Sequence, residues 1–180
     1  MQRLLIVLAF ALPVACNRAT DRTTPVDSAH MRSALTATER GVGPLRAGMT
    51  LAEASQALGS ALVLPAQADT AACRYVQWRG GPPGVRVMVE RGRVVRLDID
   101  SAGVRTAAGA GVGDTEEQLQ RLYPGRVAVA PHKYEDGHYL TVTPNPADSS
   151  FAIVFETTGG KVARYRVGLR PQVEYVEGCG

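Results

Sequence analysis

The chain has 180 residues, of which 45% are hydrophobic and 6% aromatic, and its formal net charge at pH 7 is +3. This length suffices for one domain, or for two small halves that share a core. The small net charge and the lack of any run of five basic residues argue against a nucleic-acid-binding protein, so we expect no nucleic acid among its partners.

The first sixteen residues form a short basic segment, an apolar run and a small residue before a cysteine. Arg3 is followed by the apolar residues 4–14, and Ala15 precedes Cys16. The run is too short to span a bilayer, which takes ~20 apolar residues, and it is typical of a signal peptide. It resembles the lipoprotein signal of diderm bacteria, which implies removal of residues 1–15 and lipidation of Cys16.

The residue after this cysteine bears on the location of the protein. In the lipoproteins that it resembles, an aspartate there favours retention in the inner membrane, and this chain has Asn17. The resemblance therefore implies a protein of the cell envelope that faces the periplasm and is held in the outer membrane by its lipid. Residues 16–40 are polar and threonine-rich, which is typical of a flexible tether.

Two cysteines remain once Cys16 is assigned to the lipid. Cys73 and Cys179 are an even pair in an oxidising compartment, so we expect a disulfide bond between them. In the chain-entropy model a loop of this length stabilises the fold by at most ~4–5 kcal/mol. Two free thiols, one of them reactive, are the alternative.

Residues 41–180 carry a weak internal repeat, with copies in 41–103 and 104–180. Each copy contains a capping box at the start of a predicted helix, Thr50 with Glu53 and Thr115 with Gln118. Apolar residues at helical spacing follow each box, and a glycine ends each segment. We expect two helices of about two turns, which must pack on other elements because they are too short to be stable alone.

Extended runs with alternating apolar and polar side chains follow each predicted helix. In the first copy they cover 73–78, 85–90 and 93–99, and in the second they cover 138–143, 151–156 and 161–167. A period of two with one polar face indicates antiparallel strands with one side on the core. A last short strand is expected over 173–176.

The alternation assigns a side of the sheet to each residue. The side expected to be buried contains Val87, Leu97, Ile153, Phe155 and Tyr165. The side expected to face solvent contains Arg86, Arg96, Arg164 and Arg166, with acidic residues among them as weak cross-strand ion pairs. Together these elements predict an α+β fold of two tandem repeats, each a short helix plus an antiparallel three-stranded meander, with the helices packed on one sheet face.

The order of these elements resembles the repeat shared by two families. They are the small outer-membrane lipoproteins of the SmpA/BamE type and the β-lactamase inhibitory proteins. The likeness is carried by Gly48-Met49-Thr50, the acidic residue after it, the short helix and the hairpin, within residues 45–59, 73–76 and 85–99; residues 111–125 and 151–167 repeat it more faintly. The resemblance implies a helix-on-sheet fold used for protein binding, with no catalytic residues to transfer.

Candidate partner-binding residues fall in two places. The segment 132–139 is the densest polar and aromatic cluster, and it contributes His132, Tyr134, His138 and Tyr139. The single tryptophan, Trp78, precedes the stiff loop 79–84 as a binding anchor, or else as a core residue at a strand end. The two histidines with Glu135 or Asp136 match no standard metal spacing, so we expect no metal and no cofactor.

No catalytic constellation is apparent in the sequence. There is no G-x-S-x-G motif, and the only histidines are His30, His132 and His138. We therefore expect no enzyme, but a non-catalytic protein-binding or envelope-structural module whose partner is another envelope or extracytoplasmic protein. The alternatives are a proteinaceous inhibitor of an extracytoplasmic hydrolase, which the family resemblance suggests, and an enzyme of unrecognised type.

Overall fold

A computed structural model of the protein describes residues 36–63 and 72–179. The predicted signal peptide, the lipidation site at Cys16, Asn17 and the tether up to residue 35 lie outside the described residues. Within the described part of the chain, no helix combines the length and the apolar character needed to cross a membrane.

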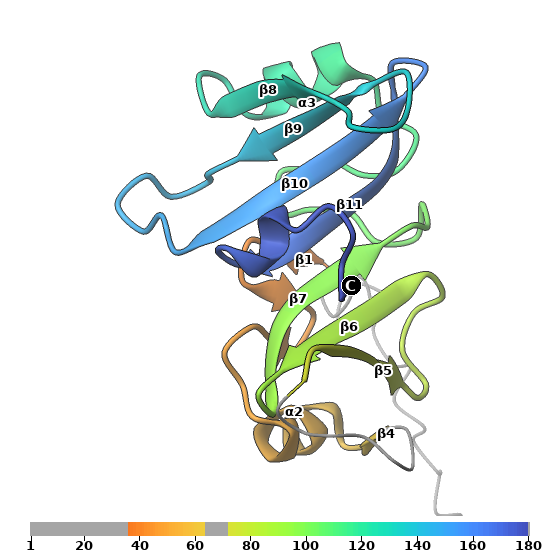
Figure 1. Ribbon diagram of the computed structural model, residues 1–180, viewed down its shortest axis with the longest axis vertical. Helices are drawn as coiled ribbons and strands as arrows, with labels where there is room; N and C mark the ends of the chain where they lie inside the picture. The colour runs from red at the N-terminus through yellow and green to blue at the C-terminus, as the bar shows by residue number, and fades with distance from the viewer. Residues whose placement is uncertain (1–35, 64–71, 180) are drawn as a thin grey trace, which may run out of the picture.

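Eight antiparallel strands form a large sheet in the spatial order β4-β5-β6-β7-β11-β10-β9-β8 (Figure 1). Its first half consists of β4 (Leu62–Val63), β5 (Arg74–Trp78), β6 (Val85–Glu90) and β7 (Arg93–Ile99). Its second half consists of β8 (Val127–Pro131), β9 (His138–Val142), β10 (Phe151–Thr158) and β11 (Lys161–Leu169). The halves are joined because β7 pairs with β11, with Leu97 opposite Val167.

A second, small sheet lies behind the large one in the view of Figure 1. It consists of β1 (Ala37–Thr38), β2 (Gly41–Val42) and β3 (Leu45–Arg46) in that order. β1 therefore lies within the last residues of the predicted tether, 16–40.

Two short helices begin at the predicted capping boxes. α2 (Leu51–Leu58) is capped by Thr50 with Glu53, and α3 (Glu116–Leu122) by Thr115 with Gln118. In both, the threonine oxygen accepts a first-turn N–H while the third residue accepts the N–H of the threonine, so the two local predictions are confirmed.

The main hydrophobic core lies between one face of the large sheet, the small sheet and the two helices. Five predicted core residues are buried in it, which confirms the predicted register for that face: Val87, Leu97, Ile153, Phe155 and Tyr165. Ala54 of α2, Leu119 of α3 and Leu45 of β3 belong to the same cluster. Each helix contributes a single fully buried residue.

The predicted fold class is wrong. The described residues are mostly β, in two sheets with two short helices, rather than two repeats of a helix and a three-stranded meander packed as a layer. The reason is that β7 and β11 pair, so the hairpins merge into one continuous sheet. Strand edges carry unpaired backbone groups that favour such merging, and no sequence pattern records it.

The predicted last strand over residues 173–176 is also wrong. The chain there forms a short 3-10 helix, η1 (Gln172–Glu174), after β11. Val173 is fully buried and packs with Ala152 and Val154 on the front face of the sheet. Residues 170–179, here called the C-terminal strap, therefore cover part of the face opposite the main core (Figure 1).

Candidate functional site

The front face of the large sheet carries opposite charges on neighbouring strands. Asp98 of β7 lies directly between Arg86 of β6 and Arg166 of β11 in the strand register. Arg96 precedes Asp98 by two residues on β7, and side chains two residues apart in a strand point to the same face, so both lie on the front face. Opposite charges on adjacent strands attract, so the register itself arranges the ionic contacts of this face.

Asp98 is bound by an arginine of its own strand. Arg96 donates from Nε and Nη2 to Oδ1 of Asp98, at 2.7 Å in each case. The Nη1 group of Arg96 donates to the backbone carbonyls of Gln172 and Tyr175 in the strap. The pair thus holds the strap against the sheet and uses most of the donors of the guanidinium.

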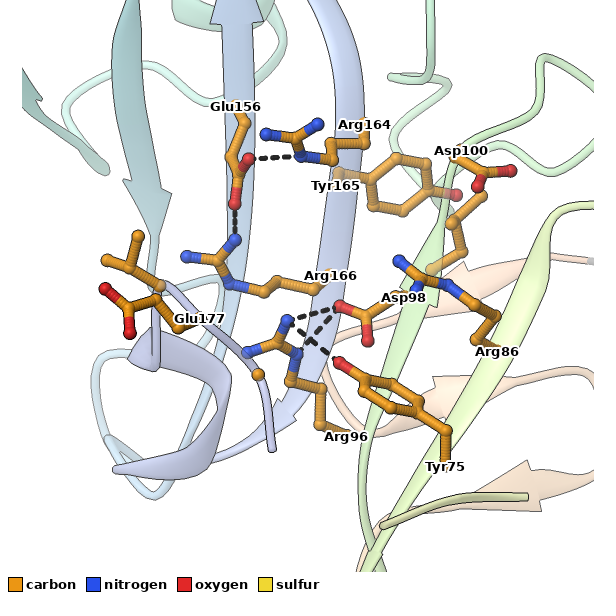
Figure 2. A pocket seen from close by; sticks show the side chains of 13 residues that line it. Tyr75, Arg86, Arg96, Asp98, Asp100, Glu156, Arg164, Tyr165, Arg166 and Glu177 are labelled. Carbon is orange, nitrogen blue, oxygen red and sulfur yellow. Dashed lines mark hydrogen bonds and ion pairs between the residues drawn. The ribbon is translucent and has the colours of Figure 1, made fainter. Parts of the chain in front are cut away.

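Glu156 of β10 is the second buried carboxylate of the face. Figure 2 shows it between Arg164 and Arg166, which both donate to it. Arg166 also donates from Nε to the carbonyl of Val173, at 2.6 Å. Burial, aided by the nearby charge of Arg96, lowers the pKa of Arg166 to about 10. The carboxylate of Glu156 thus accepts hydrogen bonds from two guanidinium groups. A general base needs a free lone pair, so this arrangement does not favour such a role for Glu156.

These contacts correct the prediction that four arginines face solvent. Arg96 and Arg166 are only 4% and 3% exposed, whereas Arg86 is exposed and Arg164 is half-buried. For these arginines the side of the sheet was identified correctly, but the strap covers the polar face, and the carboxylates of Asp98 and Glu156 supply the partners that buried arginines need. The alternation fails at Val95 and Ala163, where register shifts place Val94 and Val162 in the core instead.

A disulfide bond fixes the end of the strap. Cys73 and Cys179 are bonded, with 5.3 Å between their Cα atoms, which confirms the predicted pair. The bond ties the strap to the start of β5, beside Tyr75. Residues 106 positions apart are thereby held together at one end of the charged face.

A polar cavity of about 230 Å³ opens between the strap and strands β5, β6, β7, β11 and β10 (Figure 2). Tyr75, Arg86, Asp98 and Asp100 line it on the sheet side, and Val176 to Gly178 line it on the strap side. Burial raises the pKa of Tyr75 to about 12, and the nearby carboxylate of Asp98 adds to this. The hydroxyl of Tyr75 is therefore a neutral donor at physiological pH.

The predicted loop residues lie next to this site and are engaged within the protein. The ring of His132 stacks on that of Tyr139, with 4.3 Å between ring centroids. Glu177 of the strap accepts hydrogen bonds from the Tyr134 hydroxyl and from Lys133 Nζ, the latter at 3.0 Å. We call residues 132–135 together with 175–178 the latch, because these contacts join the loop to the strap.

His138 and Trp78 lie elsewhere. His138 Nδ1 is 2.9 Å from Oε1 of Glu116, at the start of α3. Burial alone would raise the pKa of Glu116, but its hydrogen bonds with Thr157 and His138 outweigh this and lower it. Among the described residues, no three or more His, Cys, Asp or Glu side chains gather in a way that could hold a metal ion.

Trp78 lies at the end of β5, half-buried against the main core. Strands β6, β7, β11 and β10 separate it from Tyr139 of β9, a distance of roughly 24 Å at ~4.8 Å per strand. The five predicted contact residues therefore do not form one surface: His132, Tyr134 and Tyr139 are brought together, and Trp78 is not among them.

The residues that build the cavity were not predicted to form a site. They are Tyr75, Arg86, Arg96, Asp98, Glu156 and Arg166. A signal was present, because opposite charges recur on one face of the strands β7, β10 and β11. This charge pattern could not reveal the site, because charged residues alternate along a strand in the same way whether their ion pairs are exposed or buried.

Comparison of the chain with protein-family models, with curated proteins and with solved structures found no match. The resemblance to the SmpA/BamE-type lipoproteins and the β-lactamase inhibitory proteins therefore stays a prediction.

Proposed function

We propose that the protein is a non-catalytic binding module of the bacterial envelope, anchored by a lipid on Cys16, that binds another extracytoplasmic protein through the latch. The N-terminal signal supports the location, since a lipid on Cys16 would hold the folded part at a membrane surface by a tether. The latch supports the binding role.

The observation that carries the proposal is the clustering of exposed apolar side chains on the latch. Five large hydrophobic residues are exposed in the described part of the chain: Leu122, Val129, Tyr134, Tyr175 and Val176. The last three lie on the latch, and Tyr134 is 62% exposed. Tyrosine is among the side chains that most often contribute binding energy at protein interfaces.

The latch is also held rigidly, which favours binding. The disulfide bond, the backbone contacts of Arg96 and the buried side chain of Val173 each fix the strap. A surface that is ordered before association loses less conformational entropy when a partner binds. The ionic network thus serves as a scaffold for the latch in this proposal.

Site-specific cross-linking tests the proposal. A photoreactive amino acid at Tyr134 should form a discrete covalent adduct with one envelope protein in intact cells. The same amino acid at Gln120, exposed on α3, is the matched control and should give no such adduct. Identical adduct patterns at both positions, or none at Tyr134, would contradict the proposal. The identity of the adduct would separate an envelope-structural partner from an extracytoplasmic hydrolase.

A further inference from the structure

The imidazole ring of His132 holds the turn of the latch together. Its Nδ1 atom accepts the backbone N–H groups of Tyr134 and Glu135, at 3.1 and 3.0 Å. Local contacts of this kind are usually made by the oxygens of Asn, Asp, Ser or Thr, whose protonation does not change near neutral pH. Histidine, with an ordinary pKa of about 6.5, does titrate there. The acceptor that orders this turn is therefore one that a proton can remove.

The ring is enclosed on both sides. The side chain of His132 is only 2% exposed, it stacks on the ring of Tyr139, and its Nε2 atom lies 3.5 Å from Oε2 of Glu156. Since Nδ1 accepts, the hydrogen of the neutral ring is on Nε2, next to this carboxylate. A protonated imidazole carries hydrogen on both nitrogens, so rotation of the ring cannot restore an acceptor for the two N–H groups.

The charges that face the ring already balance. Arg164 and Arg166 of β11 both contact Glu156 of β10, and Arg164 also lies 3.2 Å from Glu135 of the loop. Two guanidinium groups thus stand against two carboxylates. Burial and the two arginines lower the pKa of His132, while Glu135 acts in the opposite direction. A proton on His132 would therefore be an uncompensated charge in the closed latch.

The turn carries the two side chains that join the loop to the strap. Lys133 and Tyr134 donate to Glu177, and these hydrogen bonds lower the pKa of Glu177. Side-chain hydrogen bonds also lower the pKa of Glu135. Both acids of the latch therefore stay ionised in mild acid, which leaves His132 as its titrating group.

We infer that the latch is an acid-sensitive switch: a proton on His132 breaks the turn and detaches residues 132–135 from the strap. Above pH ~6.5 the ring is neutral and the latch is closed, whereas in mild acid the open loop, with its ring in water, takes up the proton. The strap stays in place because the disulfide bond and the backbone contacts of Arg96 hold it independently. The inference rests on the proposed function in one respect only, that this surface binds the partner.

Hydrogen exchange in the full chain, purified in detergent, tests the inference. The amides of Tyr134 and Glu135 report directly, because they are the donors to His132. After correction for the intrinsic pH dependence of exchange, their protection should fall by up to about thirtyfold between pH 7.5 and pH 5, the limit set by an ordinary histidine pKa in the open loop. Unchanged protection would overturn the inference. So would protection as high as that of β10 and β11 at pH 5, since the loop would then open only when the whole domain unfolds.

Two variants assign the effect to His132. His132→Asn keeps an acceptor near the position of Nδ1 that does not titrate, so its protection should not depend on pH. His138→Asn is the matched control and should keep the wild-type dependence, because His138 contacts Glu116 instead. A dependence that survives His132→Asn would overturn the inference.

The ring nitrogen signals of His132 in the wild-type protein give a measurement that needs no variant. Nitrogen-15 NMR should show a neutral ring with its hydrogen on Nε2 at pH 7.5, and a titration midpoint below ~6.5. A midpoint at or above this value would mean that the closed latch accepts the proton, and it would overturn the inference.

These measurements are made on the chain alone, so they are independent of the cross-linking test. Loss of protection in acid without an adduct at Tyr134 would refute the proposed function and support the switch. An adduct at Tyr134 without loss of protection would refute the switch and leave the proposed binding module intact.

Discussion

Arg96 and Asp98 form a buried ion pair within one strand, in which two nitrogen atoms of the guanidinium contact the same carboxylate oxygen at 2.7 Å. Both side chains point to the face opposite the main core and are covered by the C-terminal strap. Asp98 also lines the polar cavity beside Tyr75 and Arg86. One pair therefore fixes the strap and orients the candidate site.

Removal of this carboxylate should destabilise the protein strongly. Asp98→Asn would leave Arg96 buried without a counter-charge, and such changes cost about 3–5 kcal/mol. Urea unfolding followed by circular dichroism measures the loss. Asp100→Asn, at an exposed position on the same cavity, is the control and should change the free energy of unfolding by less than ~0.5 kcal/mol. A similar small effect of both variants would mean that the Arg96 pair is not buried.

The aromatic centre of the main core provides a second test. Phe155 is fully buried and its ring lies 5.2 Å from that of Tyr165, measured between centroids. Phe155→Ala should lower the free energy of unfolding by roughly 3–5 kcal/mol, because it removes buried apolar surface and leaves a cavity. Val129→Ala, on the edge strand β8 and 49% exposed, should have little effect. A near-neutral Phe155→Ala would place this side chain at the surface.

His132 should make stability depend on pH. Its Nδ1 accepts the backbone N–H groups of Tyr134 and Glu135, at 3.1 and 3.0 Å, so a proton on Nδ1 would break both bonds. Burial of the ring is the main cause that lowers the pKa of His132, and the charges of Arg164 and Arg166 add to it, whereas Glu135 acts in the opposite direction. Glu156, 3.5 Å from Nε2, is already bound by two arginines.

The direction of the effect follows from this lowered pKa. The unfolded chain takes up the proton near its ordinary pKa of about 6.5, while the folded protein resists protonation. The contribution of neutral His132 to the free energy of unfolding is therefore complete above pH ~6.5, and it is lost as the pH falls through the lower pKa of the folded state. Free energies of unfolding between pH 8 and pH 5 should fall more steeply for the wild-type protein than for His132→Gln. Parallel curves would refute a titrating role for His132.

The disulfide bond should stabilise the strap and, with it, the whole fold. Loss of the bond between Cys73 and Cys179, through Cys179→Ser, should lower the free energy of unfolding by about 2–5 kcal/mol. Hydrogen exchange should rise first in residues 175–178, because the buried side chain of Val173 still holds η1. Wild-type protein treated with a reductant is the control and should behave like the variant. Unchanged exchange in the strap would mean that the ionic contacts suffice to hold it.

Cys16 should determine where the protein is found. If it carries the lipid, Cys16→Ser should move the protein from the membrane fraction to the soluble fraction of the envelope, while Cys179→Ser should leave it at the membrane. Density separation of the two membranes would then test the outer-membrane location that Asn17 suggests. A wild-type protein that is already soluble would exclude the anchor.

The local elements and the disulfide bond could be predicted from the sequence alone. The capping boxes at Thr50 and Thr115 act within one helical turn, and the alternation around Val87 and Phe155 follows from the geometry of a single strand, so neither depends on distant residues. The pairing of Cys73 with Cys179 could be predicted because only these two cysteines remain once Cys16 is assigned to the predicted lipid.

The way in which these elements combine depends on long-range contacts that the sequence pattern does not reveal. The pairing of β7 with β11 unites the hairpins in one sheet, and it depends on backbone edges that have no sequence signature. Arg96 and Arg166 have the spacing of solvent-facing residues, and they are buried only because the strap folds back over them. Whether a polar face meets water or another segment is set by long-range contacts, and on this protein that contact creates both the ionic network and the cavity beside Arg86.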